Sequence, residues 1–154
     1  MAKVVLFGVS QWAELAHFYL THDSPHEVAA FTVDRDFIAG DQFKDLAVVA
    51  FDEVERHYPP DQFKMFIPVS FKRMNHIRAE KYYEAKSRGY ELISYVSSRA
   101  TIFPGLECGD NCFILEDNTR HSQRSPEPRF FRPISCNESP KTPIFQKTKT
   151  QTDN

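Results

Sequence analysis

The stretch Lys3-Val4-Val5-Leu6-Phe7-Gly8-Val9-Ser10-Gln11-Trp12-Ala13 decides the fold of this chain. The apolar run from Val4 to Phe7 is typical of a parallel strand that is buried on both faces, and Gly8 ends it. The segment 11–22 then carries apolar residues at helical spacing. A strand that ends in glycine and leads into a helix can bind an anion. Glycine lets the backbone approach the anion closely, and the first N–H groups of the helix, which have no partner within the helix, can donate to it.

The glycine turn differs from the dinucleotide-binding pattern G-x-G-x-x-G. Only the first glycine is present, and Ser10 and Ala13 stand at the other two glycine positions. The alternative interpretation is an ordinary strand-to-helix turn in which Ser10 caps the helix. The turn therefore predicts a phosphate site or a capped helix, and the pattern leaves the two open.

A second strand is predicted over 27–33, and the acidic turn Asp34-Arg35-Asp36 closes it. In a doubly wound sheet, a carboxylate at the end of the second strand is the group that meets a ribose or a base. Asp34 is therefore the candidate ligand-binding carboxylate. The alternative is a solvated turn carboxylate without a ligand.

Three more runs rich in apolar residues, at 46–50, 64–70 and 91–96, are predicted strands. A long helix is predicted over 72–87, with Ile77, Tyr82, Tyr83 and Ala85 as its core positions. Alternation of strands and helices predicts a small α/β domain with a parallel sheet.

From residue 96 the sequence repeats every six residues. The first positions of successive hexads are Val96, Ile102, Cys108 and Ile114, and the fifth positions are Ala100, Leu106, Cys112 and Asn118. Such a repeat is typical of a parallel β-helix, in which both positions point inward and three hexads make one coil. Cys108 and Cys112 are accordingly interpreted as small buried side chains, not as metal ligands, and no metal site is predicted.

The repeat stops at residue 120. Arg120 and Arg124 stand at the next inward positions, where a dry interior cannot accommodate a charge. Residues 120–154 hold five of the ten prolines, no glycine, and seven Lys or Arg against three Asp or Glu. This composition predicts a disordered tail. The abrupt change also suggests the hypothesis that the chain is a frameshifted or truncated product of a longer gene.

The composition limits the class of protein. A chain of 154 residues with 41% hydrophobic residues can form a globular domain with a short appendage, and no apolar run approaches the length of a membrane span. The short apolar run after Lys3 lacks the features of a signal peptide, and three irregularly spaced cysteines fit a reducing compartment, so a cytoplasmic protein is expected. A net charge of −2 does not indicate a nucleic-acid partner.

The order of these elements resembles the sugar acyltransferases of the sialic-acid O-acetyltransferase and bacillosamine N-acetyltransferase type. The resemblance covers residues 3–119 and rests on Gly8-x-Ser10, the strand ending at Asp34, the stretch 67–89 with its polar Asn75 and Arg78, and the segment 90–98 that leads into the hexads. In that family a small Rossmann-like domain holds a nucleotide sugar. A left-handed β-helix then binds acetyl-CoA between neighbouring subunits of a homotrimer.

The resemblance implies a division of the chain and a set of site residues. Residues 1–95 would be the Rossmann-like sugar-nucleotide-binding domain, 96–119 the first coil of the left-handed β-helix, and 120–154 an out-of-pattern tail. Gly8, Val9 and Ser10 would contact the sugar nucleotide, Asp34 its uridine or ribose, and Ser70 would lie near the sugar.

The implied reaction is transfer of an acetyl group from acetyl-CoA to a sugar hydroxyl or amine, with a β-helix histidine as the general base. No residue here is assigned that role, because His121 falls in the tail and the other histidines (His17, His22, His26, His57 and His76) stand in helices or turns of the first domain. The coils that bind CoA in the family also lie beyond the repeat seen here. We therefore expect this form to be inactive and its trimerisation to be impaired.

Three other interpretations remain open from the sequence. The chain could be a non-catalytic module that binds a nucleotide sugar. It could be an NAD-dependent oxidoreductase, although the missing glycines and the hexads disfavour this. It could also be a structural protein whose incomplete coil drives association through an apolar end.

Overall fold

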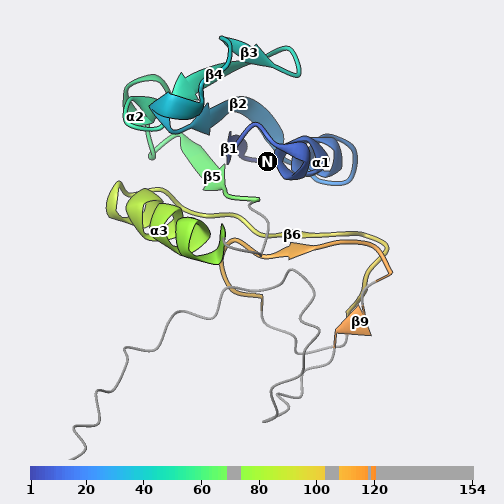
Figure 1. Ribbon diagram of the computed structural model, residues 1–154. Helices are drawn as coiled ribbons and strands as arrows, with labels where there is room; N and C mark the ends of the chain where they lie inside the picture. The colour runs from blue at the N-terminus through green and yellow to red at the C-terminus, as the bar shows by residue number, and fades with distance from the viewer. Residues whose placement is uncertain (69–73, 103–107, 118, 121–154) are drawn as a thin grey trace, which may run out of the picture.

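The computed structural model describes residues 1–68, 74–102, 108–117 and 119–120, so Ser70 and the predicted tail beyond residue 120 lie outside the described residues. Figure 1 shows the arrangement of the elements. In chain order they are β1 (Lys3–Phe7), α1 (Gln11–His22), β2 (Glu27–Val33), the 3-10 helix η1 (Arg35–Phe37), β3 (Gln42–Phe43), β4 (Leu46–Ala50), α2 (Val54–His57), β5 (Phe63–Phe66), α3 (Met74–Ser87), β6 (Tyr95–Val96), β7 (Thr101–Ile102), β8 (Phe113–Ile114) and β9 (Thr119–Arg120).

The main sheet has the strand order β3-β4-β2-β1-β5. Strands β4, β2, β1 and β5 are parallel, and the short β3 is an antiparallel edge. Beyond β5, Leu92 forms a parallel bridge with Met65, and the Ile93 N–H donates to the Met65 carbonyl at 3.0 Å. The predicted mixed α/β fold with a mainly parallel sheet is thereby confirmed.

The strand order reverses next to β1. The chain adds β2 and β4 on one side of β1 and then returns to place β5 on the other side. In open α/β sheets, ligands bind at the carboxyl edge beside such a reversal, because the loops there diverge and leave a crevice. The segments that follow β1, β2 and β5 are therefore the expected place for a ligand.

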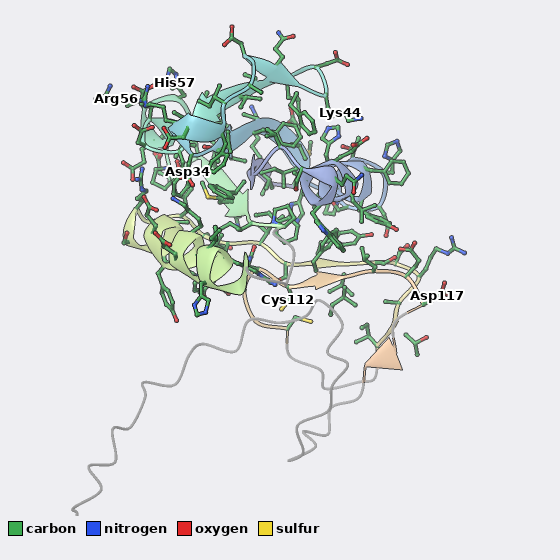
Figure 2. The ribbon with its side chains drawn as sticks, in the orientation of Figure 1. Asp34, Lys44, Arg56, His57, Cys112 and Asp117 are labelled. Atoms are coloured by element: carbon green, nitrogen blue, oxygen red, sulfur yellow. The ribbon has the colours of Figure 1, made fainter. Side chains whose placement is uncertain are left out.

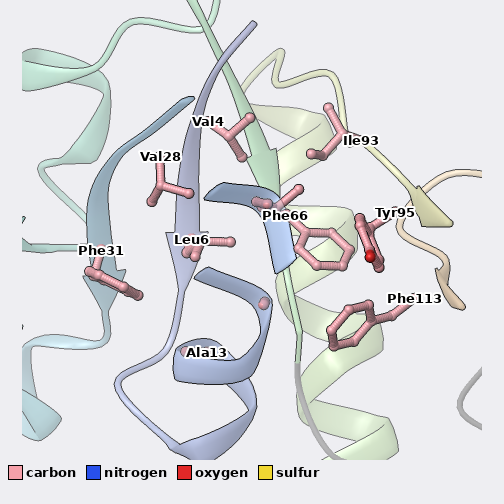
Figure 3. Packing of buried hydrophobic residues seen from close by; sticks show 11 residues of the cluster. Val4, Leu6, Ala13, Val28, Phe31, Phe66, Ile93, Tyr95 and Phe113 are labelled. Carbon is pink, nitrogen blue, oxygen red and sulfur yellow. The ribbon is translucent and has the colours of Figure 1, made fainter. Parts of the chain in front are cut away.

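Helices cover both faces of the sheet (Figure 1). Successive residues of β1 point to opposite faces, so Val4 and Leu6 pack against α1, whereas Val5 and Phe7 pack on the side of α2 and α3. Figure 3 shows the first of these clusters, in which Phe31 and Phe66 flank Leu6. Each fully buried side chain of this size contributes about 1.5–3 kcal/mol, which explains why the apolar run of β1 dominates the fold.

The inward face of α3 differs from the prediction. Ala85 is buried as expected, but Ile77 and Tyr83 are 41% and 45% exposed. Arg78 and Lys81 face inward instead, with 8% of Arg78 and 12% of the Lys81 side chain exposed. Long cationic side chains can bury their methylene stems while the charged end meets a polar partner, so hydropathy does not reveal them as inward residues.

Two short parallel strand pairs follow the sheet. Tyr95 of β6 lies beside Phe113 of β8, and Thr101 of β7 lies beside Thr119 of β9, an offset of eighteen residues in each pair. The Phe113 ring packs on Phe66 and Tyr95, with centroid distances of 5.4 and 5.6 Å. This segment therefore shares the core of the sheet. No helix in the described part of the chain is long and apolar enough to cross a bilayer.

The predicted inward positions of the hexads are only partly buried. Cys112 and Ile114 are buried, as predicted, but Cys108 is exposed and Ile102 is 38% exposed, so the prediction was wrong for these two residues. An inward position becomes buried only when another pass of the chain stacks over it. Cys112 and Ile114 lie in or next to β8, which pairs with β6 of the preceding pass, whereas no strand of the described residues pairs with residue 108.

Candidate functional site

The turn between β1 and α1 lies at the carboxyl edge of the sheet. Gly8 has a φ of +106°, a conformation that other residues rarely adopt. Its N–H donates to the Thr32 carbonyl at 2.7 Å, so the hydrogen bonds to an anion would have to come from the N–H groups at the start of α1. Ser10 is the N-cap of α1 but makes no side-chain cap bond, so the predicted capping bond is absent.

The first turn of α1 keeps the capacity to bind an anion. The Glu14 N–H makes the first bond of the helix, to the Ser10 carbonyl at 3.0 Å. The N–H groups of residues 11–13 have no partner within the helix, as in any helix start, and the positive end of the helix dipole lies there. Val9 is half-buried against the core, while Ser10 is exposed beside these N–H groups.

Replacement of Gly8 by alanine is expected to lower the free energy of unfolding by about 1–3 kcal/mol, because alanine is strained at this φ. Space is not the cause, since an added Cβ would meet only the Ala13 Cβ at 3.9 Å. Gly40→Ala is the matched control, because a Cβ there would meet nothing within 4 Å. It should stay within about 1 kcal/mol of the wild type in urea denaturation. Equal losses in the two variants would contradict the conformational explanation.

Asp34 follows β2 at the same edge, and its carboxylate is not free in solvent. The Lys81 ammonium of α3 contacts Oδ1 of Asp34 at 2.5 Å. Figure 2 shows Asp34 on the side of the sheet that faces α3. The carboxylate is therefore held in place by a residue far away in the sequence, and its side chain stays 36% exposed.

Lys81 is held on several sides. Its ammonium lies 3.0 Å from Oε2 of Glu84 and 4.9 and 5.8 Å from the ring centroids of Phe51 and Phe7. Burial alone would lower the pKa of Lys81, but hydrogen bonds and charges of Asp34 and Glu84 outweigh it and raise the pKa above its ordinary value. Lys81 thus remains a cation beneath the carboxyl edge.

Gly8, Val9, Ser10 and Asp34 accordingly meet at one edge of the sheet, whereas the predicted Ser70 lies outside the described residues. A separate hollow lies at the opposite edge, near the amino ends of β1 and β5, with Lys3, Phe63 and Glu91 in its wall. It is remote from the residues that the sequence singles out, and we assign it no role.

Asn111 connects the segment after the sheet to β5 and was not predicted from the sequence. It is fully buried, its Oδ1 accepts the Ile67 N–H at 2.8 Å, and its Nδ2 donates to the Ile67 carbonyl at 3.2 Å. Arg78 donates to the Asn111 carbonyl at 2.8 Å. The turn residues Gly109-Asp110-Asn111 signal a positive φ, which Asn111 has at +55°, but no sequence signal indicates its partner.

A second polar cluster ties the end of α1 to the segment after the sheet. Asp23, the C-cap of α1, accepts hydrogen bonds from the Tyr95 hydroxyl at 2.6 Å and the Ser98 N–H at 2.9 Å. Hydrogen bonds from Ser98 and then from Tyr95 lower the pKa of Asp23 to about 2. The ionised carboxylate is therefore part of the folded structure.

This pKa predicts a pH dependence of stability. A carboxyl group whose pKa is lower in the folded state stabilises the fold above its unfolded pKa, here 3.8, and the contribution is lost as the pH falls towards 2. Asp23→Asn should therefore be less stable than the wild type at pH 6, and the difference should shrink between pH 4 and pH 2. Urea denaturation at several pH values measures this. A difference that does not change with pH would contradict the prediction.

None of the described histidines is assigned as a general base beside the predicted site residues. His17 and His22 belong to α1, His57 to α2 and His76 to α3, while His121 lies outside the described residues. Burial lowers the pKa of His17, whose ring lies 5.7 Å from that of Phe31. In the described part of the chain, no three His, Cys, Asp or Glu side chains form a group that could hold a metal ion.

Comparison with known proteins shows where the same fold occurs. No protein-family model and no curated protein matches the chain. Among solved structures it is similar to PerB from Caulobacter crescentus, in complex with CoA and GDP-perosamine, with a TM-score of 0.64 and 17% identity over 79% of this chain and 55% of PerB. It is also similar to the acetyltransferase domain of PglB from Neisseria gonorrhoeae, in complex with acetyl coenzyme A, with a TM-score of 0.58 and 17% identity over 76% of this chain and 54% of that one.

PglB provides an acetyltransferase domain and PerB is a perosamine N-acetyltransferase, in agreement with the resemblance seen in the sequence. At this identity the likeness establishes the fold. The chain spans about half the length of each structure.

Proposed function

We propose that this chain belongs to the sugar acetyltransferases whose fold it shares, and that it holds a nucleotide sugar at the carboxyl edge of its sheet. The observation that carries the proposal is the composition of this edge. The strand order reverses between β1 and β5, and Gly8 and Asp34 follow neighbouring strands there. Helix N–H groups can bind a diphosphate, and a carboxylate can accept hydrogen bonds from a ribose.

We also propose that residues 96–119 begin a left-handed β-helix. The eighteen-residue offset of both parallel pairs supports this, because it equals three hexads of the repeat. Burial of Cys112 and Ile114 at inward positions supports it as well. The domain boundary at residue 95 remains a proposal, because Tyr95 and Phe113 share one core with the sheet.

Acetyl-CoA is the acyl donor that the proposed family implies, and PglB and PerB hold acetyl coenzyme A and CoA. The described residues after the sheet do not fit this polyanion. In 95–102, 108–117 and 119–120 the cations are Arg99 and Arg120, and they are outnumbered by the carboxylates of Asp110, Glu116 and Asp117. We therefore assign no residue of the described part to CoA.

The alternative function is a nucleotide-sugar binding module without catalysis. The net negative charge of the described coil favours it, since three carboxylates outnumber two cations there and CoA is a polyanion. The two proposals differ in one measurable property, which is transfer of an acetyl group to the bound sugar.

Calorimetry on the whole chain tests these proposals. UDP-N-acetylglucosamine, GDP, acetyl-CoA and NAD are titrated separately, and acetyl transfer to a UDP-amino sugar is assayed by release of free thiol. Saturable binding of a nucleotide or nucleotide sugar is expected. Transfer would favour the enzyme, and binding without transfer would favour the module. Binding of NAD alone would overturn both.

A pair of neighbouring variants localises the site. Asp34→Asn is expected to weaken nucleotide binding about tenfold or more, because a hydrogen bond to a charged acceptor is lost. Asp36→Asn is the matched control, since Asp36 lies two residues further along in the exposed helix η1. It should bind like the wild type. Equal affinities of the two variants would remove Asp34 from the proposed site.

The homotrimer implied by the resemblance also remains a proposal. Sedimentation velocity at several concentrations tests it. A monomer at all concentrations would agree with impaired assembly, whereas a concentration-independent trimer would show that the coils seen here are sufficient.

A further inference from the structure

Lys81 has an unusual place for a lysine. It lies on the inward face of α3, with 12% of its side chain exposed, and it reaches the carboxyl edge of the sheet below Asp34. The Asp34 side chain is 36% exposed, so the carboxylate lies nearer to solvent than the ammonium that holds it. A buried cation has a high desolvation cost, which is offset only when the cation is paired. An apolar residue at this position would fill the same space without that cost.

We propose that Lys81 is a positioning residue for the nucleoside end of the ligand. It holds Oδ1 of Asp34 at 2.5 Å and leaves Oδ2 for the ribose hydroxyls. Within the described residues, no hydrogen bond reaches Oδ2 of Asp34. This inference rests on the proposed function, in which Asp34 binds the ribose, and adds the residue that orients it.

A chain of charged contacts fixes Lys81 itself. Glu84 accepts from Lys81 at 3.0 Å and from Arg88 at 2.7 Å. Arg88 in turn donates to the Phe51 carbonyl at 2.9 Å, directly after β4. Lys81 and Glu84 of α3 alternate in charge with Arg88, the residue directly after the helix, and Arg88 contacts the chain just after β4. The orientation of the Asp34 carboxylate thus depends on contacts from α3 as well as on the turn after β2.

The ring of Phe51 adds a second restraint. The Lys81 ammonium lies 4.9 Å from its centroid, and the Arg88 guanidinium carbon lies 4.8 Å from it. Cations over an aromatic face are attracted by its quadrupole. These contacts restrain the Lys81 ammonium to one orientation. A fixed ammonium in turn fixes the Asp34 carboxylate, which must be oriented if it is to accept hydrogen bonds from a ribose.

The test compares ribose with 2′-deoxyribose. Binding of UDP, 2′-deoxy-UDP, GDP and 2′-deoxy-GDP is measured by calorimetry for the wild type, Lys81→Met, Lys81→Arg and Lys64→Met. Lys64→Met is the matched control, because Lys64 also pairs with a carboxylate, Glu91 at 2.5 Å, but lies on β5 away from the carboxyl edge. Thermal unfolding of each variant is recorded alongside.

The wild type is expected to bind the ribonucleotide about tenfold or more tightly than its deoxy counterpart, since one hydrogen bond to a charged acceptor is at stake. Lys81→Met should reduce this ratio to less than about threefold, and Lys81→Arg, which keeps the charge, should restore part of it. Lys64→Met should keep the full ratio. A purely structural role for Lys81 would weaken ribo and deoxy ligands equally.

The outcomes separate the two proposals. A wild type that binds nucleotide without preference for ribose, or a Lys81→Met variant that keeps the full preference, would overturn the role of Lys81 and leave the proposed function intact. A wild type that binds neither UDP nor GDP would overturn the proposed function and this inference with it.

Discussion

Replacement of Asn111 by alanine is expected to lower the free energy of unfolding by about 3–5 kcal/mol. The Asn111 amide makes two hydrogen bonds to the backbone of Ile67, which is 1% exposed. Without the amide, the N–H and the carbonyl of the buried Ile67 lose their partner, and each unpaired group lowers the stability by about 1–3 kcal/mol. Alanine at a φ of +55° adds backbone strain. Urea denaturation followed by the fluorescence of Trp12 measures the loss.

Two further variants separate these contributions. Asn111→Gly accepts the positive φ but lacks the amide, so it should recover only about 1 kcal/mol relative to alanine. Asp117→Ala tests the backbone term by itself, because Asp117 has a φ of +58° and is exposed. It should lose no more than about 1–2 kcal/mol. If Asn111→Gly were as stable as the wild type, the bonds to Ile67 would have no role in stability.

Replacement of Phe113 by alanine is expected to have a similar effect, about 3–5 kcal/mol. Phe113 is 3% exposed, and its ring packs on Phe66, Tyr95 and Tyr19. The variant removes a large part of the apolar contact between the segment after the sheet and the sheet itself (Figure 3). Hydrogen exchange of residues 95–96 and 112–114 should therefore accelerate more than that of β1 and β2.

Phe37→Ala is the matched control for this prediction. Phe37 lies in η1 and is 68% exposed, so its loss should change the stability by no more than about 0.5 kcal/mol. If exchange accelerated equally throughout the chain in Phe113→Ala, the segment after the sheet and the sheet would unfold as one unit, and the local explanation would fail.

The elements and their order were predictable from the sequence because their causes are local. The apolar runs of β1, β2 and β4, the helical spacing of α1 and the turn at Gly8 each depend on residues that are close in the chain. The parallel sheet follows from the alternation of strands and helices. Gly8 and Asp34 reach one edge because the carboxyl ends of neighbouring parallel strands meet there.

The buried face of α3 could not be predicted from the local sequence. Its hydropathy placed Ile77 and Tyr83 inside, whereas Arg78 and Lys81 take the inward positions. Which face of a helix is buried depends on the groups it meets, and here Arg78 meets Asn111 after the sheet and Lys81 meets Asp34 in the turn after β2. The exposure of Cys108 has the same origin, because the repeat predicts an inward position but not whether another strand covers it.

The polar contacts that organise the site could be found only in the folded chain. Asn111 pairs with Ile67 across 44 residues of sequence, and Asp23 meets Tyr95 across 72. Asp34 likewise depends on Lys81 from a distant helix. A short polar side chain has many possible partners in a sequence, and only the packing of the apolar faces brings one of them within hydrogen-bonding distance. The pattern of apolar residues therefore sets the fold, while the direction of each site carboxylate is set by tertiary contacts.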